Sequence, residues 1–312
     1  MLVAIQHGGW LAHVLGVAMK APAIALPDRC ETPFGSIAEV VDGLKAIDEK
    51  LPPDDGLGHF NHMYLAVTEG VRDAATDGMF TDSEFLTRLD VVFANRYLLA
   101  VQAASGRPVQ APQCWSVITE RRLSPYVAPL QFALAGMASH IGYDLVDSVV
   151  RTVDEFGLEP AAVKEDFTRV NAILDKLEPA TRAALTARNA THPVAEQATT
   201  LLDMVGDWGL AAARAAAFMD AELLWELRRH RHVSRGYERT LDAAVAFAND
   251  CLLVPAAELK PANLAPVNKF WHGLPTGLHG LNRLRHQPIA TLPAQRAEVI
   301  PAPTVSGTPS RR

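Results

Sequence analysis

The sequence predicts an all-α protein: one multi-helix, bundle-like domain followed by a disordered C-terminal tail. Apolar residues recur at helical spacing along most of the chain, capping residues precede several of these stretches, and no stretch alternates like a half-buried strand. The 312 residues, 49% of them hydrophobic, suffice for a large core. We therefore divide the chain into a loosely attached extension (1–35), a helical domain (36–255) and a proline-rich, mostly disordered tail (256–312).

Capping signals mark where two of the early helices begin. Ser36 and Glu39 have the capping-box spacing, and Thr81 and Glu84 repeat it. Farther along, Pro160 suits the first position of a helix. The predicted helices cover, in order, residues 35–51, 57–78, 81–104, a short segment around Trp115, 129–156, 159–177, 193–229 with a break near 205–209, and 237–254.

The charge distribution argues against nucleic-acid binding. Residues 255–312 hold seven Lys and Arg against two Asp and Glu, and the whole chain carries −6, which leaves −11 for the first 254 residues. An acidic body is poorly suited to a phosphate backbone. The sparse basic charge of the tail is typical of a solvated segment.

Cysteine usage and hydropathy favour the cytoplasm. Cys30, Cys114 and Cys251 are far apart and form no CxxC pair, which argues against a disulfide framework or a zinc cluster. No apolar run reaches the roughly 18–20 residues of a membrane span. The apolar N-terminus has no basic residue before its hydrophobic part, so we expect an extension rather than a signal peptide.

The stretch ALAGMASHIGYDLVDSVV (133–150) places titratable residues in a helix built for close packing. At 3.6 residues per turn, His140, Tyr143, Asp144 and Asp147 fall on one face, with Asp147 peripheral. The pair His140 and Asp144 suits a carboxylate that orients an imidazole for acid/base catalysis, with Tyr143 as a proton donor. The alternative is a buried histidine that an aspartate satisfies for structural reasons alone. Small residues before His140 indicate that a neighbouring helix packs closely.

Polar residues of the second and third helices are candidates for substrate binding. Asn61 and Tyr64 share a helix face with Thr68, where the amide could fix a substrate carbonyl or bridge two helices. Asp90 and Tyr97 lie seven residues apart in the third helix. They could form a polar lining, or Asp90 could pair with an arginine.

Arg214 is the most conspicuous charge, on an alanine-rich helix face that it shares with Phe218. Burying an arginine is costly unless it is paired. The partners that we expect are Asp90 or Asp144 in a structural ion pair, or an anionic group of the substrate. Phe218 and Trp208 complete the predicted substrate-binding set.

Five segments are distinctive in combination: FNHMYLAVTEGV, FLTRLDVVFANRYLLAV, PLQFALAGMASHIGYDL, RVNAIL and DWGLAAARAAAFMDAELLW. In this order and at this spacing they resemble a bacterial family known as a domain of unknown function, DUF5995. The resemblance covers about residues 40–254. It implies an all-helical fold and a bacterial origin, and it assigns no reaction.

The family pattern for the stretch around His140 reads G-M-N-A-H-I-N-H-D-L. His140 and Asp144 match it, so the resemblance implies that both are family positions. Ala138 and Gly142 stand where the pattern has asparagine, and Tyr143 stands where it has histidine. These departures fit a member adapted to a bulkier or more apolar ligand, and drift in a structural protein would give the same pattern.

We therefore predict an enzyme that acts on a small, largely apolar metabolite by cofactor-independent acid/base chemistry: cyclisation, isomerisation, elimination or hydrolysis. One alternative is a metal-dependent hydrolase or diphosphate-processing enzyme in which Asp90, His140, Asp144 and Asp147 bind Mg²⁺ or Zn²⁺. The other is a non-catalytic ligand- or partner-binding protein. We expect no nucleic-acid or membrane partner, a role in bacterial specialised metabolism, and a homodimer as one option.

Overall fold

Two helices meet closely at the centre of the fold because a glycine removes the side chain between them. The computed structural model describes residues 21–76, 80–192, 194, 201 and 209–259. Within it, α3 (Gly56–Thr76) packs along α6 (Pro129–Ser139). A Cβ atom at Gly136 would lie only 2.4 Å from the ring of Phe60. The small residues before His140 thus admit a close neighbour, as the sequence predicts.

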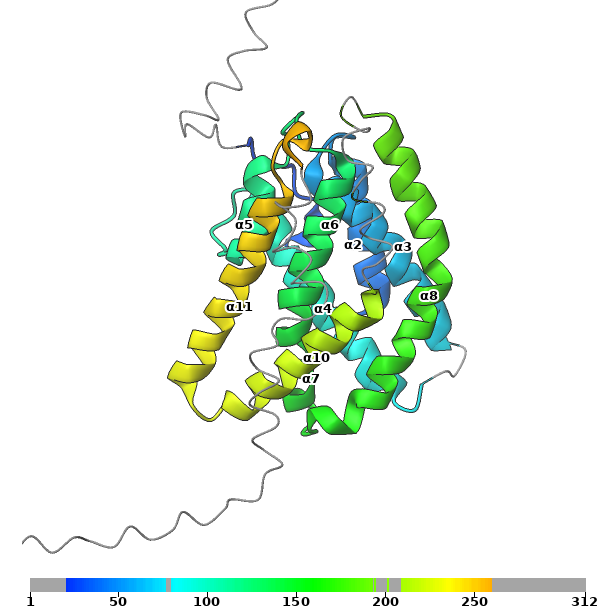
Figure 1. Cartoon of the computed structure of the whole chain (residues 1–312). Coiled ribbons are helices and arrows are strands. Elements are labelled where there is room, and N and C mark those ends of the chain that lie inside the picture. Colours follow the sequence, from blue (N-terminus) through cyan, green and yellow to red (C-terminus); the bar gives the residue numbers. More distant parts are fainter. Residues whose placement is uncertain (1–20, 77–79, 193, 195–200, 202–208, 260–312) are drawn as a thin grey trace, which may run out of the picture. The chain divides into compact units, whose positions relative to one another are not determined.

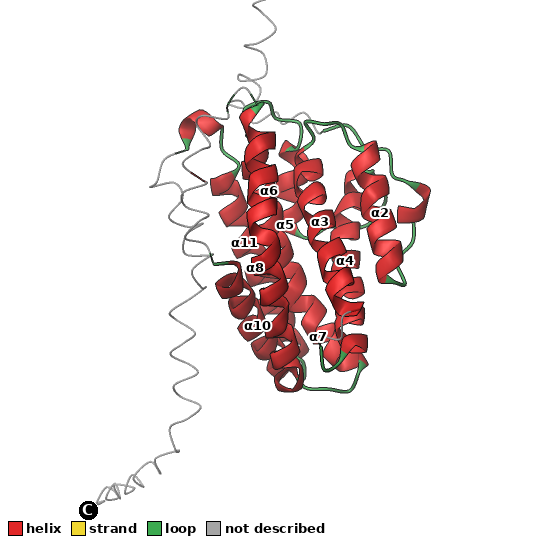
Figure 2. Ribbon diagram, turned by 90° about the vertical axis from the view of Figure 1, so that its right-hand side faces the viewer, coloured by secondary structure: helices red, strands yellow, loops and turns green. Residues whose placement is uncertain are grey.

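The described residues form helices joined by turns and loops, with no strand among them, which confirms the all-α prediction (Figures 1 and 2). The other helices are α2 (Ile37–Lys50), α4 (Ser83–Ala104), α5 (Gln113–Arg121), α7 (Leu145–Glu155), α8 (Pro160–Ala190), α10 (Leu210–Leu227) and α11 (Arg231–Leu252). Two short 3-10 turns, η1 (Asp28–Cys30) and η3 (Ala256–Glu258), and a π-helical segment, η2 (His140–Asp144), complete the fold.

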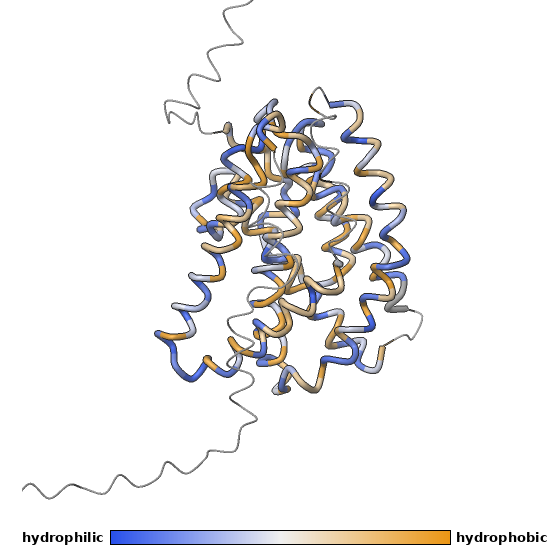
Figure 3. The backbone as a smooth tube through the Cα atoms, in the orientation of Figure 1, coloured by the Kyte–Doolittle hydropathy of each residue, from blue (hydrophilic) through white to orange (hydrophobic). Residues whose placement is uncertain are grey.

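Two hydrophobic clusters form the core. Helix α3 lies against α2, α6 and α8, while α11 covers α5 and α6 and α10 covers α7 and α8 (Figure 1). Apolar residues gather where these helices face one another, and polar residues follow the outer sides of α8 and α11 (Figure 3). One cluster surrounds Phe60 and Trp115, and the other surrounds Phe85 and Phe218. Ile141 of η2 packs against both, so the π-helical segment lies where the two clusters meet.

Local capping explains where α2 and α4 begin. The Ser36 hydroxyl accepts the N–H of Glu39, which confirms the first predicted cap. The second prediction is wrong by one residue, because Asp82 rather than Thr81 caps α4. The hydroxyl of Thr81 instead accepts a hydrogen bond from Arg169 of α8, at 2.6 Å.

Other boundaries depart further from the prediction. Helix α8 begins at Pro160, as predicted, but continues to Ala190, and α11 begins at Arg231, six residues before the predicted start. Helix α10 lies within the predicted 193–229 region, most of whose first half is outside the described residues. The predicted tail from residue 260 onward is also outside them.

The segment before α2 is anchored to the core. Cys30 and Phe34 are buried. The side-chain amide of Asn95 bonds to both the N–H and the carbonyl of Phe34, and that of Gln102 donates to the Cys30 carbonyl. These contacts correct the prediction of a loose attachment for residues 21–35. Residues 1–20 lie outside the described residues.

The close approach of α3 and α6 makes Gly136 sensitive to one added methyl group. We expect Gly136→Ala to lower the free energy of unfolding by about 1–3 kcal/mol, because Cβ of Phe60 also lies within 2.6 Å of the new atom and the backbones must separate. Gly236→Ala in α11 is the matched control. Apart from its two chain neighbours and the nearby backbone of its own helix, no atom lies within 4 Å of the added Cβ, so this change should stabilise the protein by about 0.5–1 kcal/mol. Urea unfolding of both variants measures this, and equal effects would contradict the packing argument.

Candidate functional site

A π-helical turn joins α6 to α7 at the centre of the candidate site. It comprises His140–Asp144, and the N–H of Leu145 bonds to the carbonyl of His140, five residues back. Such a turn holds one residue more than the α-helix assumed from the sequence. It therefore rotates the following residues by roughly 100° about the helix axis, and the four residues predicted to share one face are divided.

His140 and Asp144 stay together and bond to each other. Nδ1 of His140 lies 3.1 Å from Oδ2 of Asp144, and the indole N–H of Trp115 donates to the same oxygen at 2.9 Å. Because Oδ2 already acts as an acceptor, we assign the N–H of His140 to Nδ1. This tautomer leaves Nε2 as an acceptor, and Nε2 has no hydrogen-bond partner within the described part of the chain.

Burial controls the electrostatics of this pair. The side chains of His140 and Asp144 are 4% and 0% exposed. Burial lowers the pKa of His140 and raises the pKa of Asp144, and their mutual hydrogen bond opposes both shifts. Burial therefore disfavours both charged forms. Above both pKa values, a neutral imidazole stands beside a carboxylate.

Aromatic rings fix the orientation of the His140 imidazole. Phe93 stacks on it with ring centroids 3.5 Å apart and planes inclined by 8°. Tyr64 meets it edge to face at 4.5 Å, and Phe60 does so at 5.5 Å. These contacts and the bond to Asp144 leave the ring one orientation, which is the preorganisation that acid/base catalysis requires.

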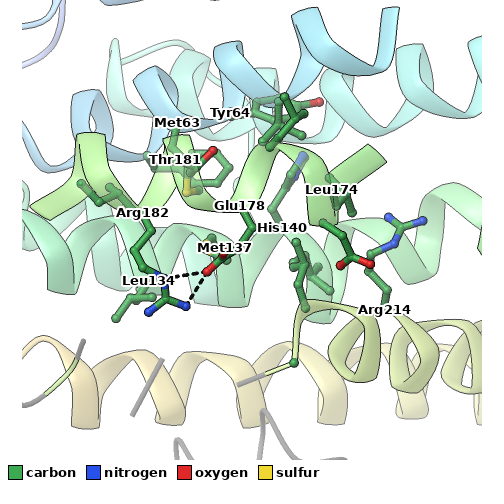
Figure 4. Close-up of a pocket in the computed structure, with 18 of the residues that line it drawn as sticks. Met63, Tyr64, Leu134, Met137, His140, Leu174, Glu178, Thr181, Arg182 and Arg214 are labelled. Carbon is green, nitrogen blue, oxygen red and sulfur yellow. Dashed lines mark hydrogen bonds and ion pairs between the residues drawn. The ribbon is translucent and has the colours of Figure 1, made fainter. Parts of the chain in front are cut away.

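A cavity of about 630 Å³ lies beside His140, between α3, α6, α8 and the start of α10. Its wall is mainly apolar, with Met63, Leu134, Met137 and Leu174 among the lining residues (Figure 4). Asp144 is not part of the wall. We call this space the main cavity. Nδ1 of His140 is turned to Asp144, and Nε2, the other ring nitrogen, is buried and has no hydrogen-bond partner in the described structure.

Charged side chains lie on opposite sides of His140 in the main cavity (Figure 4). On one side, Arg182 donates to Glu178, one turn earlier in α8, at 2.6 Å. On the other side is Arg214 of α10. A ligand in the main cavity would thus meet apolar walls with a few polar groups at fixed places, which is the usual character of a small-molecule site.

Tyr143 and Asp147 are separated from the cavity by the rotation at η2. Tyr143 does not line the main cavity but packs against both hydrophobic clusters. Asp147 forms ion pairs with Arg96 at 3.1 Å and with Arg151 at 2.5 Å. The prediction of one shared face is therefore wrong for these two residues, and Asp147 is peripheral, as predicted.

Of the predicted substrate-binding residues, Tyr64 lines the main cavity. The amide of Asn61 instead donates to the carbonyl of Leu44 at 2.9 Å, which is the bridge between helices that the sequence left open. Tyr97 is buried against Phe60 and Trp115, and Phe218 belongs to the second hydrophobic cluster; neither is in the main-cavity wall. Trp208 lies outside the described residues.

Arg214 is buried without the expected ion pair. Nε donates to Asn171 at 2.8 Å, one terminal nitrogen donates to the carbonyl of Phe167 at 3.0 Å, and the guanidinium lies over the Phe167 ring. Asp90 attracts the Arg214 guanidinium electrostatically, but it is too far away to form an ion pair. Burial lowers the pKa of Arg214 to about 10 and raises that of Asp90 to about 7, and their attraction opposes both shifts. The predicted direct pairing with Asp90 or Asp144 is therefore corrected.

The ligand set of the metal-dependent alternative is not assembled. In the part of the chain that the structure describes, no group of three or more His, Cys, Asp and Glu side chains is placed to hold a metal ion. Of the four residues suggested as ligands, Asp147 forms ion pairs with two arginines, and Asp90 interacts electrostatically with Arg214.

Sequence reasoning missed three contributors to the site. The Trp115 bond to Asp144 joins residues 29 apart in the chain, and the stacking of Phe93 on His140 joins two helices, so neither has a local signal. The third is the second half of α8. There the i, i+4 spacing of Glu178 and Arg182 is a readable helix signal, although it does not indicate a cavity.

Comparison with known proteins identifies the family. The family model described as "Family of unknown function (DUF5995)" matches residues 37–255. The chain belongs to this family. No curated protein and no solved structure matches the chain.

The DUF5995 match begins at the first residue of α2 and ends just after α11. It therefore includes η2, the His140–Asp144 pair and every residue of the main-cavity wall. Within the described ranges of this DUF5995 protein, no helix has both the length and the apolar character needed to cross a membrane.

The raised pKa of Asp90 predicts a pH-dependent effect of Asp90→Asn on stability. Between about pH 4 and 7, the unfolded chain ionises Asp90 while the folded chain keeps it protonated, so the folded state binds more protons. The stabilisation that the folded state gains from binding this extra proton is therefore lost as the pH rises from about 4 to 7. We expect the free energy of unfolding of Asp90→Asn minus that of the wild type to increase from pH 4 to pH 7. Urea unfolding at several pH values measures it, with exposed Asp154→Asn as control, and a constant or decreasing difference would contradict the prediction.

Proposed function

We propose that this protein is an enzyme that binds a small, largely apolar metabolite in the main cavity and transforms it by acid/base chemistry at His140. One observation carries the proposal: a buried histidine is held by an aspartate through Nδ1, while its Nε2 lacks a partner and its ring lines an apolar cavity. His140 would take a proton from the ligand at Nε2 and return it to another atom. Cyclisation, isomerisation, elimination and hydrolysis all use such a step.

The roles of the neighbouring residues follow from their contacts. Asp144 would orient the imidazole and stabilise its protonated form during the reaction, and Trp115 would hold Asp144 in place. A neutral His140 is ready to act as a base, and the apolar wall strengthens its interaction with developing charge. Tyr64, which lines the main cavity and meets His140 edge to face, would be an additional proton carrier on the wall.

The proposed setting is the cytoplasm of a bacterium, in specialised metabolism. Cys30, Cys114 and Cys251 are all free thiols, which suits a reducing compartment. The apolar wall suits a hydrophobic metabolite rather than a highly charged central metabolite. The same apolar wall would also suit a carrier protein that binds the metabolite without converting it. The following experiment distinguishes this second function from the enzymatic one.

Replacing His140 by glutamine should abolish conversion of the ligand. We would incubate the purified protein with apolar extracts of bacteria and follow each component by mass spectrometry. The wild type should consume one component and form a product, and His140→Gln should do so at least about 100-fold more slowly. His62→Gln, which changes a half-exposed histidine, is the control. A folded His140→Gln that converts the component at the wild-type rate would contradict the proposal, and retention without conversion by the wild type would establish a carrier.

A further inference from the structure

Arg214 is a buried cation in the wall of the main cavity, at the side where Leu174 also lies (Figure 4). The groups that hold its guanidinium are neutral. Nε donates to the side chain of Asn171, and Nη2 donates to the carbonyl of Phe167. Within the described part of the chain, no carboxylate forms an ion pair with it. These contacts fix where the guanidinium lies without neutralising its charge.

Part of the guanidinium remains open to a ligand. A guanidinium has five N–H donors, and the two bonds to Asn171 and Phe167 leave three of them on the terminal nitrogens. Nη1 has no bond within the described structure, and it is not among the unpaired polar atoms that are fully enclosed there. The Phe167 ring also supports the guanidinium, with its centroid 4.3 Å from Cζ. Arg214 therefore offers donors at a fixed place, which is what fork-like binding of a carboxylate requires.

The charge of Arg214 needs an anion more than that of the second arginine in the wall. Removing a guanidinium from water is costly unless an anion lies beside it. Asp90 attracts Arg214 but is too far away to form an ion pair, and burial raises the pKa of Asp90 to about 7, so this carboxyl is partly protonated at neutral pH. The side chain of Arg182, in contrast, is 38% exposed and bonds to Glu178 at 2.6 Å. An anion in the main cavity would therefore be bound by Arg214 rather than by Arg182.

The rest of the wall restricts that anion to a single charge. A dianion such as a phosphate would keep one charge that Arg214 does not neutralise, in mainly apolar surroundings. Asp175 and Glu178, which also line the main cavity, would repel the additional charge. A carboxylate carries one charge, and its two oxygens match the spacing of guanidinium N–H groups.

We propose that Arg214 binds the carboxylate of a ligand whose apolar body fills the main cavity. The substrate class is thus an apolar monocarboxylic acid, and Arg214 is a specificity-determining residue. Because Arg214 and Arg182 lie on opposite sides of His140, the body of a ligand anchored at Arg214 would extend past the imidazole (Figure 4). This inference rests on the proposed function for the identity of the main cavity as the substrate site.

Four probes of equal chain length test the head-group preference. Octanoate, octan-1-ol, octylammonium and octyl phosphate would be titrated into the wild type at pH 7 by calorimetry. We expect octanoate to bind at least about 10-fold more tightly than each of the others, because it alone brings a single negative charge to the guanidinium. Equal or tighter binding of any other probe would overturn the proposal, as would the absence of binding by all four.

Arg214→Gln tests where the carboxylate binds, with Arg182→Gln as the matched control from the same wall. Arg214→Gln should bind octanoate at least about 10-fold more weakly than the wild type, but octan-1-ol within about 3-fold, because only the carboxylate needs the positive charge. Arg182→Gln should bind octanoate within about 3-fold of the wild type, because Arg182 is exposed and already paired. Unchanged octanoate binding by Arg214→Gln would overturn the proposal. An equal loss for octanoate and octan-1-ol would also overturn it, since Arg214 would then only shape the cavity.

A second variant keeps the inference testable if Arg214→Gln does not fold. Asp90→Asn keeps the shape of the side chain and removes the carboxylate that attracts Arg214 in the described structure. It should therefore bind octanoate at least as tightly as the wild type, and weaker binding would overturn the inference. Failure of the proposed function has a different signature, since it appears as conversion by His140→Gln and leaves the preference for octanoate unaffected.

Discussion

The buried carboxylate of Asp144 is the interaction on which the rest of the site depends. It holds His140 and Trp115 through one oxygen, and so ties the π-helical segment to α5. Asn249 of α11 strengthens the same junction, because its amide donates to the hydroxyl of Ser139 and to a carbonyl of α5. Removing the Asp144 carboxylate would release the imidazole orientation and leave the indole N–H unpaired at the meeting point of both hydrophobic clusters.

His140 combines an unpartnered ring nitrogen with a place in the wall of the main cavity. Other buried polar atoms of the described core also lack a hydrogen-bond partner, among them Nδ1 of His59 and the hydroxyl oxygen of Tyr97, but neither residue lines the main cavity. Because buried polar atoms are usually paired, this coincidence at His140 is the physical basis for assigning a ligand to the main cavity.

Local signals predicted the helices but not the site. Ser36 and Pro160 begin helices because capping and a fixed φ act within one turn, and such patterns are readable from sequence. The π turn is not readable in this way, so an α-helical phase wrongly placed Tyr143 and Asp147 beside His140. The bond from Trp115 depends on how α5 packs against η2, and no periodicity contains that information. The predicted contact between His140 and Asp144 is correct, because a spacing of four residues is still nearly one turn of the wider π-helix.

The central claim is that burial keeps His140 a neutral imidazole, while Asp144 holds its proton on Nδ1 and so leaves Nε2 without a proton. Nitrogen-15 NMR of the histidine side chains tests it most directly, with the His140 signals assigned by their loss in His140→Gln. At pH 7 the account predicts a protonated Nδ1, an unprotonated Nε2 and titration below the usual pKa of 6.5. A proton on Nε2, or an imidazolium ion at pH 7, would contradict it.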